Sequence, residues 1–193
     1  MAAAGNVGTG FSKPYVALYA ASGGTVTYTS GQLLARGVDV TLSPESGSDN
    51  KFYADNVVAE SAPSKFTNGT VTLTIDGLFN ATRELIYGLP AATGGWTAYG
   101  DSMAVPYVGI GFIQRVQSEG VESFIPYVLP KCKFQLEETS AATQGEEIDW
   151  QTQALTADVF RADDTNHNWK HVGDPETTET AAETALKAFL GIN

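Results

Sequence analysis

The chain has little of the chemistry on which many enzymes and secreted proteins depend. Its 193 residues include a single cysteine, Cys132, so no disulfide can form within the chain. Cys132 lies in an alternating apolar run, which favours a small buried side chain over a nucleophile. The two histidines, His167 and His171, are four residues apart, but no glutamate follows His167 and the segment has the composition of a loop. We therefore expect no metal site.

A long hydrophobic run is also absent. The first apolar stretch spans only residues 15–21 and follows Lys13 and Pro14, which makes a poor secretion signal. No run approaches the ~20 apolar residues that a membrane helix needs. We expect the chain to be made in a cytoplasm and to have no membrane partner.

Basic residues are few. Lysine and arginine number 11 against 22 aspartates and glutamates, which gives a formal net charge of −11. A strongly acidic surface repels phosphate, so this balance argues against sequence-reading or tight binding of nucleic acid. A general role of acidic charge in solubility remains open beside any more specific one.

Known catalytic motifs are missing. There is no Gly-x-Ser-x-Gly and no phosphate-binding P-loop. Gly109 and Gly111 form a Gly-x-Gly pair, but the third glycine and the helix of a dinucleotide site do not follow. Within a strand, such glycines make room for a neighbouring backbone or side chain. The glutamate pairs at 137–138 and 146–147 are typical of a solvated loop. We expect no catalytic residue, no cofactor and no enzymatic activity.

The residue types that are abundant, and their order along the chain, indicate a mainly β (α+β) fold. Short Thr-, Val- and Tyr-rich runs alternate with clusters of Gly, Asn, Asp and Ser. The clearest alternation places Val71, Leu73 and Ile75 on one face, with Thr70, Thr72 and Thr74 on the other. Strands are expected over 15–19, 25–29, 38–42, 52–59, 70–76, 108–112, 128–136 and 148–160. Residues 1–12 are small and polar and are expected to form a flexible arm.

Two helices are expected. Asp76 would cap a short helix that runs to about Tyr87 and ends at Gly88. Its inner stripe would be Leu78, Thr82, Leu85 and Ile86. A second, amphipathic helix is expected over about 175–190, with Asp174 as N-cap and Pro175 at the first position. Its apolar stripe would be Ala182, Ala185, Leu186, Phe189 and Leu190.

A loop rich in turn residues is expected over 43–50, between the strands at 38–42 and 52–59. These two strands could pair as a hairpin with the loop at its tip. Because of its Gly and Ser content, the loop would become ordered only on assembly.

Several motifs occur together in an order known from one family. They are FYADNVVAE at 52–60, AVPYVGIGF at 104–112, YVLPKCKF at 127–134 and TQGEEIDWQT at 143–152. In this order they resemble the major tail proteins, or tail tube proteins, of siphophages of Gram-positive hosts, of the phi13 or TP901-1 type. The resemblance covers about residues 38–162. The helix near the C-terminus and the N-terminal arm lie outside it.

The resemblance implies a structural virion protein with a β-sandwich-like tail tube domain. Together with the N-terminal arm, we expect this domain over 1–162, with 43–51 as the stacking loop, and a linker and the C-terminal helix over 163–193. Subunits of this family form hexameric rings, whose sheets close into an inner β-barrel. Stacked rings enclose a tape measure protein and meet tail terminator and distal tail or baseplate proteins. The genome passes through the lumen during DNA ejection without specific binding. The tail would be assembled in the cytoplasm of a bacterial host.

The residues themselves fit this expectation. An open sheet leaves unpaired edges, which closure across subunits would remove. A polar face carrying Thr70, Thr72 and Thr74, together with Asp149, Gln151 and Gln153, could face a watery lumen. An excess of negative charge there would repel DNA phosphates.

Two alternatives stay open. A surface or carbohydrate-binding β-sandwich would use aromatic side chains such as Trp96, Trp150 or Trp169, although isolated tryptophans are more often core or interface residues. The tube protein of a contractile injection system would share the fold.

Overall fold

The computed structural model describes residues 5–62, 64–101, 103–143 and 150–192, and within them the fold is mainly β. One large antiparallel sheet has the strand order β2-β1-β7-β8-β9-β6-β3, and β10 pairs with β8. The strands are β1 (Val7–Ser22), β2 (Thr25–Leu33), β3 (Gly37–Ser46), β6 (Phe66–Ile75), β7 (Val108–Ser118), β8 (Val121–Phe134), β9 (Gln153–Phe160) and β10 (His171–Val172). The predicted mainly β class is confirmed.

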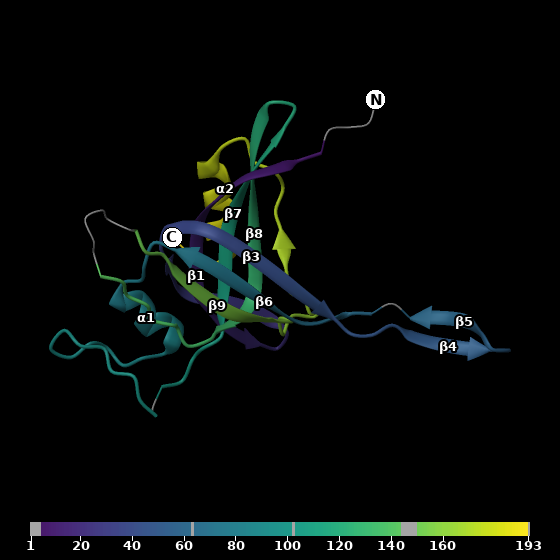
Figure 1. The fold of residues 1–193 in the computed structure, drawn as a ribbon, viewed down its shortest axis with the longest axis horizontal. Coiled ribbons are helices and arrows are strands. Elements are labelled where there is room, and N and C mark those ends of the chain that lie inside the picture. Colours follow the sequence, from purple (N-terminus) through teal and green to yellow (C-terminus); the bar gives the residue numbers. More distant parts are fainter. Residues whose placement is uncertain (1–4, 63, 102, 144–149, 193) are drawn as a thin grey trace.

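Strand β8 joins the two halves of this sheet. Its first part pairs with β7 from Val121↔Ser118 onward, and its last residues, Lys131 to Phe134, pair with β9. The half made of β2, β1 and β7 and the half made of β9, β6 and β3 pack around one core, to which both contribute buried side chains. The fold is therefore a two-layered β structure that one long strand connects (Figure 1).

The core follows from the alternation in the strands. Val71, Leu73 and Ile75 of β6 are fully buried, and the buried Ala157 and Leu155 of β9 pair with Val71 and Leu73. The predicted inward row of β6 is confirmed. Cys132 is also fully buried in this core, as expected, and burial raises the pKa of its thiol.

Helix α2 (Glu179–Phe189) covers the opposite face of β1, β7 and β8. Leu186 and Leu190 pack there with Ile113 and Val128. The glycines of β7 allow this approach, because a Cβ on Gly111 would lie 2.5 Å from Leu186 Cδ1. The prediction that these glycines make room for a neighbouring side chain is confirmed.

The predicted start of α2 is wrong. The N-cap is Thr178, whose hydroxyl accepts from Ala181 N at 3.2 Å, not Asp174. The chain before it is extended, because Glu176 and Phe124 exchange two backbone hydrogen bonds along the edge of β8. Of the predicted stripe, Ala182, Leu186 and Leu190 are buried, while Ala185 and Phe189 are exposed.

Helix α1 (Asn80–Tyr87) ends at Gly88 as predicted, with φ of 61°. The predicted cap is wrong, because the N-cap is Phe79 and no side chain caps the helix. Asp76 instead accepts from Arg36 N at 3.1 Å and forms an ion pair with the Arg36 side chain at 2.8 Å. Thr82 and Ile86 are buried, and Leu78 and Leu85 pack partly against the core, so the predicted inner stripe is confirmed.

The N-terminal arm was predicted too long. Strand β1 begins at Val7, which pairs with Gln117 of β7, so residues 7–12 are strand. These residues are poor in apolar side chains, but backbone pairing with β7 does not require them. Residues 1–4 lie outside the described residues. The predicted strands at 15–19 and 25–29 are parts of the longer β1 and β2.

The predicted hairpin around 43–50 is wrong. Strand β3 continues to Ser46 and pairs with β6, for example Ser43↔Thr70. The hairpin is formed instead by β4 (Asn50–Ala54) and β5 (Val57–Ala62), joined at Asp55 and Asn56 with φ of 49° and 63°. Aspartate and asparagine tolerate this left-handed conformation, which a two-residue hairpin turn requires. Figure 1 shows the β4–β5 hairpin projecting far beyond the sheet.

Within the described part of the chain, neither helix combines the length and the hydropathy that a membrane crossing demands.

Candidate assembly surfaces

A polar face covers β3, β6, β9 and the end of β8. Across these strands Thr41, Thr72 and Thr156 lie in one row, since Thr72 pairs with both neighbours. The next row is Ser43, Thr70 and Asp158, and Asp158 in turn pairs with Lys133 of β8. All of these side chains are partly or fully exposed. The polar face predicted for β6 is confirmed and extends over three neighbouring strands.

The polar residues that β9 contributes to this face are not the ones that the sequence predicts. Gln153 pairs with the buried Ile75 and so shares the core-facing side of β9. Gln151 precedes β9, and Asp149 lies outside the described residues. Thr156 and Asp158 occupy the polar face in their place. The prediction that Gln151 and Gln153 lie in this face is wrong, because β9 begins only at Gln153 and its odd-numbered residues, among them Leu155 and Val159, face the core.

Charges on the polar face nearly balance. Its acidic side chains are Asp39, Glu45 and Asp158, and its basic ones are Lys131 and Lys133. Gln135 Nε2 donates to Asp158 at 2.9 Å, and Lys131 pairs with Asp163 at 2.7 Å. The acidic excess of the whole chain is therefore not concentrated on this face, which is mainly hydroxylated.

The two end strands of the large sheet have an unpaired edge in the part of the chain that the structure describes. There, β2 pairs only with β1, and β3 pairs only with β6. By contrast, β10 and Glu176 cover the edge of β8 near Tyr127 and Phe124. Unpaired edges present free N–H and C=O groups that another strand can bind.

The β4–β5 hairpin exposes large apolar side chains. Phe52, Tyr53 and Val57 are 64%, 60% and 63% exposed, and Val58 is 49% exposed. The two strands pack chiefly on each other. At the base of the hairpin, Asp49 Oδ1 accepts from Ser64 N at 2.9 Å. Because an isolated two-stranded hairpin is marginally stable in water, such a hairpin gains from a partner surface.

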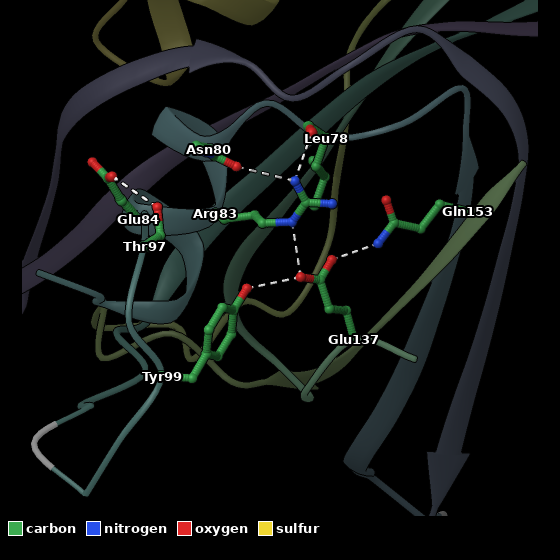
Figure 2. A network of polar contacts seen from close by, with 8 residues as sticks. All are labelled: Leu78, Asn80, Arg83, Glu84, Thr97, Tyr99, Glu137 and Gln153. Atoms are coloured by element: carbon green, nitrogen blue, oxygen red, sulfur yellow. Dashed lines mark hydrogen bonds and ion pairs between the residues drawn. The ribbon is translucent and has the colours of Figure 1, made fainter. Parts of the chain in front are cut away.

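A buried ion pair fixes α1 against the ends of β8 and β9. Arg83 Nε and Glu137 Oε1 are 2.8 Å apart, and both side chains are largely buried. Figure 2 shows how the two side chains point toward each other. Tyr99 donates to the same oxygen at 2.8 Å, and Gln153 Nε2 donates to Oε2 at 2.5 Å. Burial, followed by the bond to Glu137, raises the pKa of Tyr99 to about 12, so its hydroxyl remains a donor.

The same helix holds the loop that follows it. Glu84 Oε1 accepts from Ala92 N at 2.9 Å and from Thr97 Oγ1 at 3.3 Å (Figure 2). Between these two anchors lies Trp96, which is 82% exposed. These contacts have a structural role, because they hold in place the irregular segment that carries the exposed Trp96 side chain.

A second cluster anchors α2 to β1. Glu183 Oε1 accepts from Tyr15 Oη at 2.5 Å and is 3.1 Å from Lys187 Nζ, while Oε2 is 3.3 Å from Lys13 Nζ. The hydrogen bond from Tyr15, together with the two lysines, lowers the pKa of Glu183 to about 2. The carboxylate therefore stays ionised at neutral pH.

The candidate ligands and catalytic groups of the sequence do not converge. His167 has φ of 53° and its Nδ1 is 3.2 Å from Ala162 O, whereas His171 belongs to β10 and lies against Phe189. Over the described residues, no three side chains among His, Cys, Asp and Glu lie close enough to hold a metal ion. Glu146 and Glu147 lie outside the described residues.

The tryptophans have different surroundings. Trp169 stacks on Phe66 with ring centroids 4.3 Å apart, next to the core. Trp96 and Trp150 are more than four-fifths exposed. The sequence pattern gave no sign of this, since exposure depends on tertiary neighbours.

The exposed hairpin was the feature that sequence reasoning missed. Its apolar residues were assigned to one strand of 52–59, although Asp55 and Asn56 in the middle are residues that favour a turn. No protein-family model matches this chain, and no curated protein matches it.

Proposed function

We propose that this chain is a structural subunit that polymerises with its own copies into a tube, as the tail tube proteins of long non-contractile phage tails do. The observation that carries the proposal is a hydroxylated sheet face that ends at the unpaired strand β3 and continues into a hairpin of exposed apolar side chains. In an isolated monomer the strand edge and the apolar hairpin stay exposed to water. In an assembly both would be covered, and the hydroxylated face would line a channel.

The polar face supports a channel wall. Its core-facing side carries the buried Val71, Leu73 and Ile75 of β6 and Leu155 and Val159 of β9, so the hydroxylated side is the one that would meet water or a passing polymer. Because its three carboxylates nearly balance its two lysines, neither attraction to nor strong repulsion of DNA phosphates is built into it. Such a wall would let a duplex pass without binding.

The free edge of β3 supports lateral closure. A sheet of this length that ends in an unpaired strand invites pairing with another chain, and closure into a ring removes the exposed edges. Sixfold rings are part of the proposal. The β4–β5 hairpin, rather than the segment 43–51, then makes the contacts between successive copies.

The other partners follow from the same proposal. A tube of stacked rings would enclose a tape measure protein and meet terminator and distal tail or baseplate proteins at its ends. It would be assembled in a bacterial cytoplasm and retained in the virion. Neither a cofactor nor an enzymatic activity belongs to this function.

The test is polymerisation of the purified chain. We expect tubes in negative-stain electron microscopy at high protein concentration and a mass above that of the monomer in light scattering. Val38→Lys, which places a charge on a side chain that is 55% exposed on the edge strand β3, should keep the fold but abolish tubes. Val121→Lys, at the first residue of β8, which is 66% exposed, is the matched control and should assemble normally. A chain that stays monomeric at every concentration, alone and with a tape measure protein, contradicts the proposal.

Carbohydrate binding is a second candidate, favoured only by the exposure of Trp96 and Trp150. Quenching of tryptophan fluorescence by glycans that is lost in Trp96→Ala would support it.

A further inference from the structure

An apolar groove lies between the first part of β1 and the edge strand β3. Its volume is about 420 Å³. Its lining includes Gly8, Gly10, Phe11, Val40, Leu42 and Tyr127. Phe11 and Tyr127 both contact the ring of Phe112 in the main core. The groove is thus a place where the core reaches the surface between two strands.

Among the described residues, no strand pairs with either flank of the groove on that side. Residues 7–12 of β1 pair with β7, while pairing with β2 begins only at Tyr15. β3 pairs with β6 alone. The narrow end is filled by Phe11, which packs over Gly37. Beyond that point, the groove offers apolar side chains below and unpaired backbone groups along its rim, which is the arrangement that an added β-strand recognises.

We propose that this groove binds the β4–β5 hairpin of a second copy of the chain, whose strand pairs with the free edge of β3. This inference rests on the proposed self-assembly and names the surface that the hairpin contacts. The hairpin cannot reach the groove of its own chain, because it extends away from the sheet (Figure 1). The partner is therefore another molecule.

The side chains of the hairpin match the groove on both sides of the added strand. Cross-strand partners share a face, so Ala54 and Val57 lie on one side and Tyr53 and Val58 on the other. By alternation, Phe52 joins Ala54 and Val57, and Glu60, which pairs with Phe52 nearer the base of the hairpin, lies on the same face. The three apolar side chains would continue the inward row of Val40 and Leu42. The apolar area of Phe52 and Val57 that is exposed on the isolated hairpin would then be buried.

The charges also match. Lys51 shares the face of Tyr53, which in the docked strand is the outward face, and Asp39 lies on the outward face of β3 at the rim of the groove. Lys51 is the hairpin's only cation, and Asp39 is the only acidic residue among those lining the described groove. The docked hairpin would place the two side chains next to each other.

Disulfide trapping between two variants tests the contact. Both carry Cys132→Ser; one adds Val57→Cys in the hairpin and the other adds Leu42→Cys in the groove. Mixed and assembled under mild oxidation, they should give a cross-linked dimer. The pairs of Val57→Cys with Val121→Cys, at the start of β8 outside the groove, and with Trp96→Cys, in the exposed loop after α1, are the controls and should not cross-link. Thermal unfolding of each variant establishes that it is folded.

Tubes that form without the Val57–Leu42 cross-link, or with one to Trp96→Cys instead, overturn this inference and leave the proposed function standing. Absence of any assembly in the unmodified chain overturns both.

Exchange of the two charges is an independent test. Lys51→Glu should raise the concentration needed for assembly by roughly five- to tenfold. Lys51→Glu combined with Asp39→Lys should restore it, which loss of a merely structural lysine would not allow. Lys65→Glu, outside the hairpin, is the matched control. Equal effects of Lys51→Glu and Lys65→Glu, or no rescue by the double variant, contradict the proposed pairing.

Discussion

Gly111 shows how a single residue sets the spacing between two layers. It lies in β7 beneath α2, and a Cβ added there would lie 2.5 Å from Leu186 Cδ1 and 3.0 Å from Leu190 Cδ1. Gly111→Ala should therefore push α2 outward and lower the free energy of unfolding by about 1–3 kcal/mol. Urea unfolding measures the loss, and hydrogen exchange should show faster opening of α2 amides.

Gly100→Ala is the control for this substitution, because no atom lies within 4 Å of a Cβ built there and its φ is not positive. It should leave stability nearly unchanged. An equal loss in both variants would mean that backbone freedom, rather than the contact with α2, accounts for the effect.

The ionisation of Glu183 makes the free energy of unfolding depend on pH. Its pKa is lowered to about 2 in the folded protein from about 4.5, so its contribution is complete above pH 4.5 and is lost as the pH falls toward 2. Glu183→Gln should cost about 1–2 kcal/mol at pH 7, since the side chain is only partly screened by solvent.

The gap between wild type and Glu183→Gln should close as the pH falls from 4.5 to 2, which urea unfolding at several pH values measures. Glu122→Gln, at an exposed residue of β8, is the control and should follow the wild type throughout. A gap that persists at pH 2 would show that packing, not ionisation, accounts for the loss.

At the scale of single residues, sequence reasoning succeeded where a rule is local. Gly88 ends α1 because a left-handed residue is needed there, and the β7 glycines were correctly assigned to close packing. It failed for Asp76 and Asp174. Each is a good N-cap by type, but one is paired with Arg36 and the other lies beside a stretch that bridges to β8. In both cases, contacts with residues distant in the sequence determine where the helix begins.

At the scale of elements, two ion pairs of equal length differ in burial. Arg83–Glu137 and Arg36–Asp76 are both 2.8 Å, but the Arg36 side chain is 90% exposed while that of Arg83 is 25% exposed. Arg83→Met should cost about 2–3 kcal/mol, because Glu137 would remain buried without its cation. Arg36→Met, the matched control, should cost at most about 0.5 kcal/mol.

Proteolysis of the segment after α1 distinguishes local unfolding of that segment from unfolding of the whole protein. Arg83→Met should expose 89–101 to cleavage at concentrations of denaturant that leave the wild type intact. If Arg36→Met proves as destabilising as Arg83→Met, burial does not determine the strength of these pairs.

The errors in the element predictions have a shared cause. Strands with clear alternation, such as β6, were placed correctly, because one face is buried and the other is not. The hairpin β4–β5 is exposed on both faces, so its sequence carries no alternation that marks the turn. The start of β1 is held by backbone pairing, which leaves no trace in side-chain type. Which strands pair with which could not be read from one sequence.

At the scale of the whole molecule, assembly must overcome a net charge of −11 on every copy. The proposed contacts are apolar and backbone contacts along the hairpin and the edge of β3, whereas repulsion between acidic surfaces opposes them. Added salt shortens the screening length from about 10 Å at 0.1 M to about 3 Å at 1 M, and it weakens the repulsion without weakening apolar burial.

The concentration needed for assembly should therefore fall by roughly tenfold or more between about 0.05 and 0.5 M NaCl, and further in sulfate. Sedimentation of polymer at a series of protein concentrations measures it. Val38→Lys is the control and should remain monomeric at every salt concentration, since screening cannot restore a blocked strand edge. Assembly that weakens as salt rises would mean that ion pairs between copies dominate, and the apolar hairpin would then not be the main source of cohesion.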